Sequence, residues 1–431
     1  SGKRPVAELK PGFLAEFLVK KVDTERQTLE VELQQVPAVQ ASIVCINSHT
    51  GEVVAMVGGY DFHTSKFNNA TQGMRQTGSA YKPFIYTAAV EDGMTPDSIV
   101  SGAPIKRGGW QPTNYGGAPS HPNVPMKIAL AKSYNIAAVH LLEQVGIQAG
   151  GQMVRRFGIT NPMAPSLPSA LGASEASLLE MVAAYSTFPN KGVRMNPHMI
   201  RKVYNRDGTL LEEYDGGSSK VTSEYVALTM VKMMRGVVAG GGTATGASAG
   251  GFPLAGKTGT VNNETDVWFI GYTPTYVTGV WMGNPAGKIS LGAGMTGGHG
   301  AVPYFNAFMN AFMKGKPRDS FPEPPPMPKD IKALAERNKR EELEKLDEAD
   351  LKARQAGVAM PNPKVNTDPA LIPPDKVGGE TTPGTTDKPP ATTTDKPPVI
   401  KRPETKPPVT KPDPPSEKPA GEKRKGKKGD G

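Results

Sequence analysis

The sequence predicts an α+β domain, built as an antiparallel sheet flanked by helices and followed by a disordered C-terminal tail. Three observations support this prediction. A pair of strand-like runs opens the domain, apolar helical segments fill its middle, and three further strand-like runs close it. The closing strands are therefore expected to join the opening pair in one sheet, with the helices packed against it.

Two strand pairs are predicted in the first 60 residues. Residues 12–36 contain two short apolar runs around a polar turn, which is too little to fold alone. We therefore expect residues 1–36 to be the end of an inter-domain linker module that starts before Ser1. Residues 38–60 contain two β-branched runs around a turn in which Gly51 can supply the positive φ that such a turn needs. This hairpin is predicted to open the main domain.

Helical signals follow the hairpin. Ser177 and Glu180 have the spacing of a capping box, and Ser223 is the expected N-cap of a later apolar run. The predicted helices occupy residues 79–93, 124–146, 174–192 and 223–241. The predicted closing strands occupy residues 252–261, 266–274 and 275–284.

Composition sets the domain boundaries. Hydrophobic residues make up only 37% of the chain, and the deficit lies beyond about residue 317, where Pro, Lys, Thr, Asp and Glu dominate. We therefore expect the folded domain to span residues 37–316. Residues 317–359 are predicted to form a charged, largely helical extension, with the helix over 329–357. The Pro/Lys/Thr-rich residues 360–431 are predicted to be disordered.

Several classes of function are disfavoured by the sequence. Much of the net charge of +9 lies in the tail, so it gives little support to a folded nucleic-acid site, and no nucleic-acid partner is expected. Cys45 lies in an alternating apolar run and is predicted to be a core residue. The six histidines are scattered, so we expect no metal cluster, no serine–histidine triad and no cofactor. No apolar run approaches the length of about 18 residues that a membrane span needs.

Residues 79–90 begin with a serine, a lysine and a proline at the start of an apolar helical run. Helix positions three apart share a face, so Ser79 and Lys82 are expected to point the same way. Pro83 has no amide hydrogen to give to the carbonyl of residue 79, so the helix must begin at or near Ser79. At a helix N-terminus the helix dipole stabilises negative charge that develops on a serine oxygen, and a neighbouring amine could take its proton.

Two further polar clusters accompany this segment. Ser133 and Asn135 lie two residues apart, where a predicted helical segment is interrupted. The other cluster lies on a predicted strand and comprises Lys257, Thr258, Gly259 and Thr260. Ser-x-x-Lys alone is expected by chance about once or twice in a chain of this length, whereas all three clusters in this order are expected in roughly a few per cent of chains at most.

The three clusters resemble the active-site signature of the penicillin-binding proteins and serine β-lactamases, which is Ser-x-x-Lys, Ser-x-Asn and Lys-Thr-Gly. The similarity continues outside the motifs, in residues 44–62, 67–86, 171–197, 241–247 and 257–274. These segments look like the transpeptidase domain of class A penicillin-binding proteins, specifically the 1A group. The resemblance covers residues 37–316 nearly continuously and implies the penicillin-binding transpeptidase fold.

The resemblance implies a peptidoglycan DD-transpeptidase that uses the D-Ala-D-Ala end of a stem peptide as donor. Ser79 would form the acyl-enzyme, Lys82 would act as its base with a lowered pKa, and Ser133 would relay a proton to the leaving amine. The residues implied in substrate binding are Asn135, Lys257, Thr258, Gly259 and Thr260.

More specific roles follow from the same resemblance. Asn135 would orient Lys82 and the substrate amide, and Lys257 would hold the terminal carboxylate of the substrate. Gly259, which lacks a side chain, would let the substrate lie against the strand edge as an added strand. The backbone amides of Ser79 and Thr260 would form the oxyanion hole.

The resemblance also implies partners and a location. Stem peptides and lipid II-derived glycan strands are the expected substrates, β-lactams the expected covalent inhibitors, and other cell-wall synthesis proteins the expected partners. The domain would act in the periplasm, and a glycosyltransferase domain and an inner-membrane anchor are expected before Ser1. Two alternatives stay open: a serine β-lactamase, which needs a second base to deacylate with water, and a non-catalytic sensor of β-lactams or wall peptides.

Overall fold

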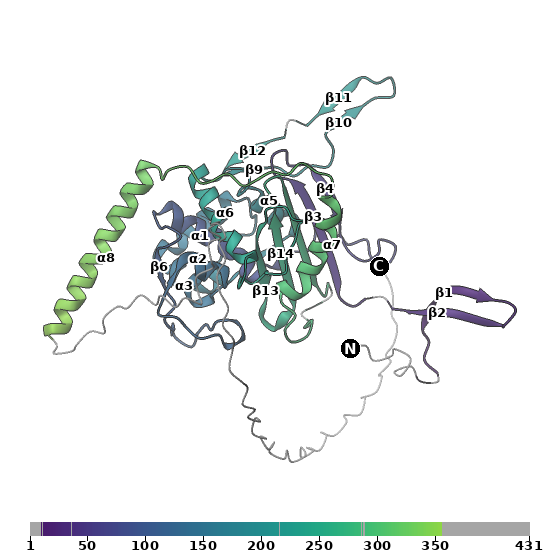
Figure 1. Cartoon of the computed structure of the whole chain (residues 1–431), viewed down its shortest axis with the longest axis horizontal. Coiled ribbons are helices and arrows are strands. Elements are labelled where there is room, and N and C mark those ends of the chain that lie inside the picture. Colours follow the sequence, from purple (N-terminus) through teal and green to yellow (C-terminus); the bar gives the residue numbers. More distant parts are fainter. Residues whose placement is uncertain are drawn as a thin grey trace, which may run out of the picture. The chain divides into compact units, whose positions relative to one another are not determined.

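The main sheet contains five antiparallel strands. The computed structural model describes residues 10, 12–35, 37–214, 216–285, 287 and 289–355, and the predicted disordered tail at 360–431 lies outside them. The strands are β3 (Gln40–Asn47), β4 (Val53–Val57), β13 (Ala255–Thr260), β14 (Asp266–Tyr272) and β15 (Tyr276–Gly283). Their order is β13-β14-β15-β3-β4, so the opening hairpin pairs with the last strand (Figure 1). The predicted single antiparallel sheet is confirmed, and β13 lies at its edge.

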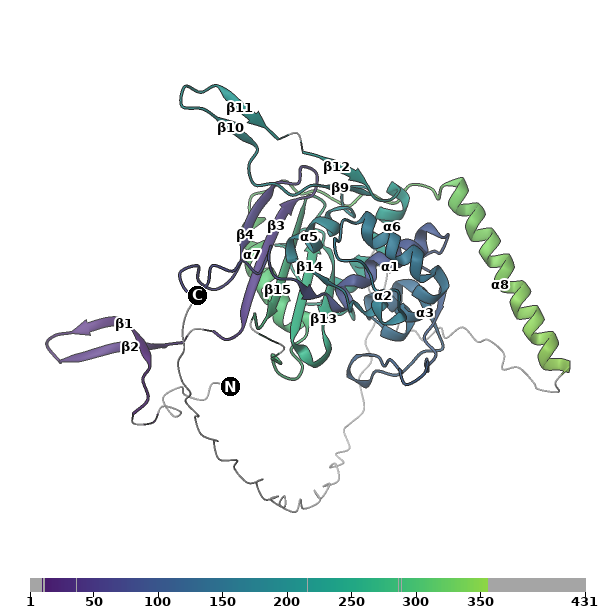
Figure 2. The ribbon, with the colours of Figure 1, turned by 180° about the vertical axis from the view of Figure 1, so that it is seen from behind.

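Helices cover both faces of this sheet. α5 (Leu178–Ser186) packs against one face, where the Cβ position of Gly279 lies close to Leu178 and Val182. α7 (Val302–Phe312) packs against the other, and its Phe305 meets Phe269 edge-to-face with ring centroids 4.8 Å apart (Figures 1 and 2). Every residue of β14 is buried as a result, which explains why this strand has an almost continuous apolar sequence.

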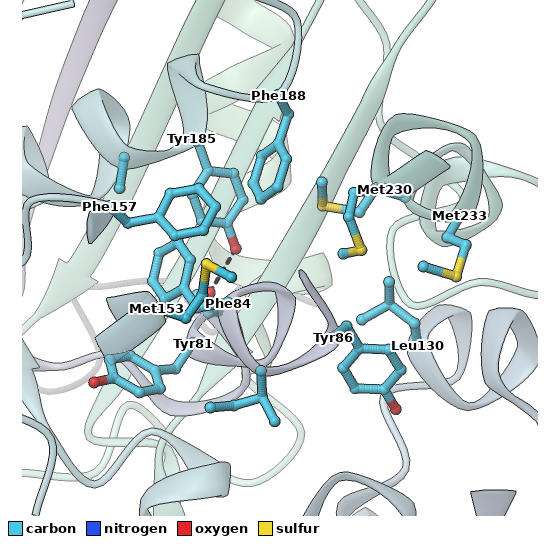
Figure 3. Packing of buried hydrophobic residues seen from close by; sticks show 14 of the residues in the cluster. Tyr81, Phe84, Tyr86, Leu130, Met153, Phe157, Tyr185, Phe188, Met230 and Met233 are labelled. Atoms are coloured by element: carbon cyan, nitrogen blue, oxygen red, sulfur yellow. Dashed lines mark hydrogen bonds between the residues drawn. The ribbon is translucent and has the colours of Figure 1, made fainter. Parts of the chain in front are cut away.

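A group of helices packs beside the sheet around a central helix. The group comprises α1 (Lys82–Glu91), α2 (Met126–Ala131), α3 (Asn135–Val145), α4 (Ile147–Arg156) and α6 (Glu224–Val238). All residues of α1 from Lys82 to Val90 are buried, so this helix is apolar all round. Figure 3 shows Phe84 of α1 packed among Phe157, Tyr185 and Phe188, and the Tyr185 hydroxyl donates a 2.5 Å hydrogen bond to the Ala80 carbonyl.

The predicted helix starts are confirmed where a cap marks them. The Ser177 hydroxyl accepts from the Glu180 amide, and the Glu180 carboxylate accepts from the Ser177 amide, which completes the capping box. Ser223 accepts from the Val226 amide in the same way. The predicted helix over 124–146 is divided into α2 and α3, with Ser133 between them. Neither α4 nor α7 was predicted.

The remaining strands form separate two-stranded pairs outside the main sheet. The N-terminal hairpin, predicted from residues 12–36, consists of β1 (Glu16–Asp23) and β2 (Thr28–Gln34). The other pairs are β5 (Arg75–Gln76) with β8 (Glu175–Ala176), β6 (Ile99–Ser101) with β7 (Asn123–Pro125), β9 (Val193–Met195) with β12 (Ser218–Lys220), and β10 (Lys202–Tyr204) with β11 (Leu210–Glu213).

Packing continues beyond the predicted domain boundary at residue 316. Phe321 is 9% exposed and lies edge-on to Tyr272, with ring centroids 5.9 Å apart. The helix predicted over 329–357 is present as α8 (Lys329–Gln355), and its first turns are not free in solvent. Ile331 is buried, and Asn338 donates to the Asp92 carbonyl over 2.7 Å. No helix in the described part of the chain combines enough length with enough apolar character to cross a membrane.

Candidate active site

Ser79 lies in a single 3₁₀ turn, Gly78–Tyr81, that leads directly into α1. The Lys82 amide donates to the Ser79 carbonyl, and Pro83 stands in the first turn of α1, where a missing amide hydrogen is tolerated. The helix therefore begins where the sequence predicts. Ser79 is half-buried, and its hydroxyl makes no hydrogen bond with any described residue.

Two close backbone contacts fix the Ser79 turn. The Gly78 amide donates to the Gly172 carbonyl over 3.1 Å. A Cβ atom on Gly172 would lie 1.9 Å from the Gly78 carbonyl oxygen, and one on Gly78 would lie 2.6 Å from the Thr260 carbonyl oxygen. Since both glycines also have positive φ values, larger residues are excluded from this contact. The turn and the end of β13 are thereby held together.

Lys82 is completely buried, and its amine faces the start of α3. Its Nζ donates to the Ser133 carbonyl over 2.6 Å, to Asn135 Oδ1 over 2.7 Å and to Ser133 Oγ over 3.2 Å. Two of the three sequence clusters therefore meet at one buried amine.

Ser133 has φ 57°, in the left-handed region that non-glycine residues rarely occupy. This conformation ends α2 and turns both polar groups of Ser133 toward Lys82. Backbone strain of this kind costs on the order of 1–3 kcal/mol and is concentrated at functional sites. It also explains why the predicted helix is interrupted here.

Lys257, which belongs to the third cluster, is hydrogen-bonded to the Ser133 hydroxyl. It is completely buried in β13, and its Nζ donates to Ser133 Oγ over 2.9 Å and to the Thr258 carbonyl over 3.1 Å. Ser133 Oγ therefore lies between two lysine amines. Since a hydroxyl has two lone pairs, it can accept from both amines and still direct its own hydrogen elsewhere.

The two amines have lowered pKa values. Burial lowers the pKa of Lys257 to about 7. Burial, followed by the repulsion from Lys257, lowers the pKa of Lys82 well below its usual value. The amine one turn from Ser79 can therefore be neutral near physiological pH, as a proton acceptor must be.

A cavity of about 730 Å³ opens above these groups. The predicted site residues that line it are Ser79, Ser133, Asn135, Thr258 and Thr260. Lys82, Lys257 and Gly259 lie beneath this surface and are buried. The Thr258 hydroxyl is bonded to that of Thr243 over 2.7 Å, and the Thr260 hydroxyl accepts from the Gly297 amide over 3.1 Å.

The structure adds a packing requirement for glycine at position 259. A Cβ atom there would lie 2.5 Å from the Thr77 carbonyl oxygen and 3.1 Å from the Ala80 Cβ. Both atoms belong to the segment that carries Ser79, and neither lies on the open edge of β13. The missing side chain therefore lets the strand approach the Ser79 turn.

Several residues around the site were not found from the sequence. Asn114 is buried, and its Oδ1 accepts from the Asn135 amide over 2.9 Å, so it caps α3 from 21 residues away. The Tyr115 hydroxyl donates to Glu264 over 2.8 Å, which joins a loop of the helical region to the turn after β13. Thr243 supports Thr258 as described above. Each contact joins distant segments, so no local pattern could indicate it.

No metal site is evident in the part of the chain that the structure describes, since no three His, Cys, Asp or Glu side chains there are grouped to hold an ion. The groups that converge at the cavity are hydroxyls, amides and amines. This set is suited to nucleophilic catalysis by a serine with a lysine base.

Comparison with known proteins supports the same family. The family described as "Penicillin binding protein transpeptidase domain" matches residues 41–310. Penicillin-binding protein 1A of Neisseria gonorrhoeae is 40% identical over 296 residues, which cover 65% of this chain and 37% of that protein. Penicillin-binding protein 1A of Aquifex aeolicus is 38% identical, over 67% of this chain and 40% of that protein. The chain thus spans well under half the length of these relatives.

Solved structures show the same fold. The crystal structure of penicillin-binding protein 1A from Haemophilus influenzae aligns with a TM-score of 0.64 and 28% identity, over 70% of this chain and 51% of that one. The PonA1 protein of Mycobacterium tuberculosis in complex with penicillin V aligns with a TM-score of 0.61 and 27% identity, over 68% and 85%. Because the family matches well over half of the sequence, and because the fold agrees, this chain belongs to the penicillin-binding protein transpeptidase family.

Proposed function

We propose that this domain is a serine DD-transpeptidase that cross-links peptidoglycan stem peptides and is acylated by penicillin. The observation that carries the proposal is the meeting of all three polar clusters at Ser133 Oγ, between the amines of Lys82 and Lys257. The Ser79 turn lies at the wall of the same cavity.

In the first half-reaction, Ser79 Oγ attacks the carbonyl carbon of the penultimate D-alanine, and neutral Lys82 takes the hydroxyl proton. The backbone amides of Ser79 and Thr260 stabilise the oxyanion, a contribution of about 10²–10³-fold per donor in other enzymes. The amide C–N bond then breaks. The leaving amine of D-alanine takes a proton through the Ser133 hydroxyl, and an ester joins the donor peptide to Ser79.

In the second half-reaction, an amine of a neighbouring stem peptide attacks the ester. Its proton passes to Lys82, the C–O bond breaks, and the Ser79 alkoxide is reprotonated. The product is a new amide cross-link. Water in place of the amine would give the carboxypeptidase reaction, with a free carboxylate as product.

The two alternatives are less well supported. A serine β-lactamase needs a second base to activate water, and none of the described residues that line the cavity is a carboxylate or an imidazole. A purely non-catalytic sensor would have no use for a buried amine of lowered pKa one turn from an accessible serine.

The setting of the reaction is also part of the proposal. Each of the relatives named above is a penicillin-binding protein 1A, and this chain spans only 37–40% of their length. We infer that the parent protein is a bifunctional synthase at the inner membrane, whose transpeptidase domain meets glycan strands and synthesis partners in the periplasm.

The proposal is tested by mass spectrometry of the intact chain after exposure to benzylpenicillin. The wild type is expected to gain the mass of one penicilloyl group and to release it slowly, whereas Ser79→Ala gains none. Ser219→Ala, which removes an exposed hydroxyl on β12 away from the cavity, is the matched control and is expected to be acylated normally. Normal acylation of Ser79→Ala would overturn the assignment, and sustained turnover by the wild type would favour the β-lactamase.

A further inference from the structure

One side chain among the described residues that line the cavity carries a basic group. Among the described residues that line it, Lys132 is the only one with an ionisable acidic or basic group apart from the phenols of Tyr115 and Tyr134. The remaining lining residues are neutral polar or apolar. A partly enclosed cavity with a single cation attracts and orients the anionic part of a ligand.

Lys132 occupies a defined position beside the predicted catalytic residues. It directly precedes Ser133 at the end of α2, and its side chain is half-buried. Its Nζ lies against the loop after α6, since a Cβ atom on Gly241 would be 3.2 Å away from it.

The same loop carries Thr243, which connects Lys132 to the strand motif. The Thr243 amide donates to the Ala131 carbonyl over 3.2 Å, and its hydroxyl is bonded to that of Thr258 over 2.7 Å. The ammonium group of Lys132 and the hydroxyls of Thr243 and Thr258 therefore belong to adjoining parts of one cavity wall.

The Lys132 ammonium has no hydrogen bond or ion pair with any described residue. Lys127, five positions earlier on the same helix, shows the contrast, because its Nζ forms a 2.8 Å ion pair with Asp97. A cation that lines a cavity without a protein partner remains available to a ligand.

Lys257, to which the family resemblance assigns the substrate carboxylate, is poorly placed for that contact. It is completely buried, it does not line the cavity, and its Nζ is already bonded to Ser133 Oγ and the Thr258 carbonyl. These contacts direct the Lys257 amine to Ser133, the proposed proton relay at the cavity wall.

We propose that Lys132 is the cationic residue that binds the terminal carboxylate of the donor peptide, and the equivalent carboxylate of a penicillin, beside the hydroxyls of Thr243 and Thr258. Lys257 then attracts the carboxylate electrostatically without a direct hydrogen bond, and its main role is to hold the Ser133 hydroxyl in place. The assignment rests on the proposed transpeptidase function and adds the residue that recognises the charged end of its substrate.

The test compares an acylating agent with and without its carboxylate. Second-order acylation rates of the full chain are measured with benzylpenicillin and with benzylpenicillin methyl ester, and their ratio gives the preference for the carboxylate. We expect Lys132→Met to reduce this ratio about 10- to 100-fold, as expected for the loss of a charge-assisted hydrogen bond. Lys132→Arg is expected to restore most of it. Lys127→Met, which removes the paired lysine of the same helix, is expected to keep the wild-type ratio.

The outcomes separate this inference from the proposed function. An unchanged ratio in Lys132→Met, with normal acylation of the wild type, overturns the role of Lys132 and leaves the transpeptidase proposal intact. Absence of acylation of the wild type by either compound overturns the proposed function itself. If Lys132→Met does not fold, Lys132→Gln is read by the same ratio, because it removes the charge and keeps a polar end at this half-buried position.

Discussion

Lys82 and Lys257 place two amines on one serine hydroxyl, at 3.2 and 2.9 Å, in a completely buried environment. Burial disfavours the charged form of each amine, and a charge on one disfavours a charge on the other. The pair can therefore carry one proton far more easily than two. This property suits a site in which one amine must accept a proton while the other keeps the relay in place.

Stability should depend on pH because of these lysines. The folded pKa of Lys257 is about 7, below its value of about 10.4 in an unfolded chain. Between these values the unfolded state binds one more proton, so the free energy of unfolding should rise with pH by about 1.4 kcal/mol per unit for this residue. Lys257→Met should lose this contribution. Denaturant unfolding at about pH 7.5 and about pH 9 measures the slope.

A partly exposed lysine provides the control for that slope. Lys127→Met changes the same residue type at a partly exposed position and should retain the pH dependence of the wild type. If Lys257→Met showed an unchanged slope as well, the buried amine would have to be charged at neutral pH, and the shared relay described above would be wrong.

The three predicted polar clusters meet at Ser133 Oγ, and the local geometry of two of them follows from the sequence. Pro83 fixes the start of α1, and the left-handed Ser133 ends α2. The sequence could not indicate the contacts of Asn114 and Thr243 or the place of Lys132 in the cavity wall, since these depend on how distant segments pack. For the same reason, the burial of Lys257 and its distance from the cavity surface were not foreseen.

The helices and strands were predicted best where a short sequence signal, such as a capping serine, marks them. Capping serines and a β-branched hairpin identified α5, α6 and the first strands of the sheet. α4 contains two adjacent glycines, Gly150 and Gly151, which lower intrinsic helix propensity. α7 follows a glycine-rich stretch and gains its stability from Phe305 and Met309, which are buried in one apolar cluster with Phe269 and Val280 of the sheet. The formation of α4 and α7 therefore depends on tertiary packing and is not marked by a local sequence signal.

The contact between β13 and the Ser79 turn should tolerate no side chain at Gly259. Gly259→Ala would place a Cβ atom 2.5 Å from the Thr77 carbonyl, so the strand or the turn must move. We expect a loss of about 1–3 kcal/mol in the free energy of unfolding and a slower acylation by benzylpenicillin. Gly246→Ala is the matched control, because an added Cβ there meets open space. Equal acylation of both variants would show that the close approach does not position Ser79.

At the scale of the whole molecule, the folded unit extends beyond the catalytic region. The boundary at residue 316 was placed where the composition changes, but the proline-rich segment that follows carries Phe321 into the buried apolar cluster that includes Phe84 and Tyr272. Ile331 and Asn338 then attach the first turns of α8 near Asp92 and Gly93. Composition locates the change in sequence type and does not show which single apolar residues beyond it are buried.

Phe321 should therefore contribute to the stability of the catalytic domain. Phe321→Ala removes a ring that packs on Tyr272 and is expected to lower the free energy of unfolding by about 2–4 kcal/mol. Leu343→Ala, which changes an exposed residue of α8, is expected to change it by less than about 0.5 kcal/mol. Thermal or denaturant unfolding of the full chain distinguishes the two. Similar small effects would mean that residues 317–355 are only an appendage.

The left-handed conformation of Ser133 limits how this domain can be engineered. Glycine would relieve the backbone strain there, so a search for more heat-resistant variants is expected to favour Ser133→Gly. The same replacement would delete the oxygen that both lysines share. If Ser133 is the relay proposed above, heat resistance and turnover conflict at this single position. A screen that selects only for survival on heating would then enrich variants that benzylpenicillin acylates slowly.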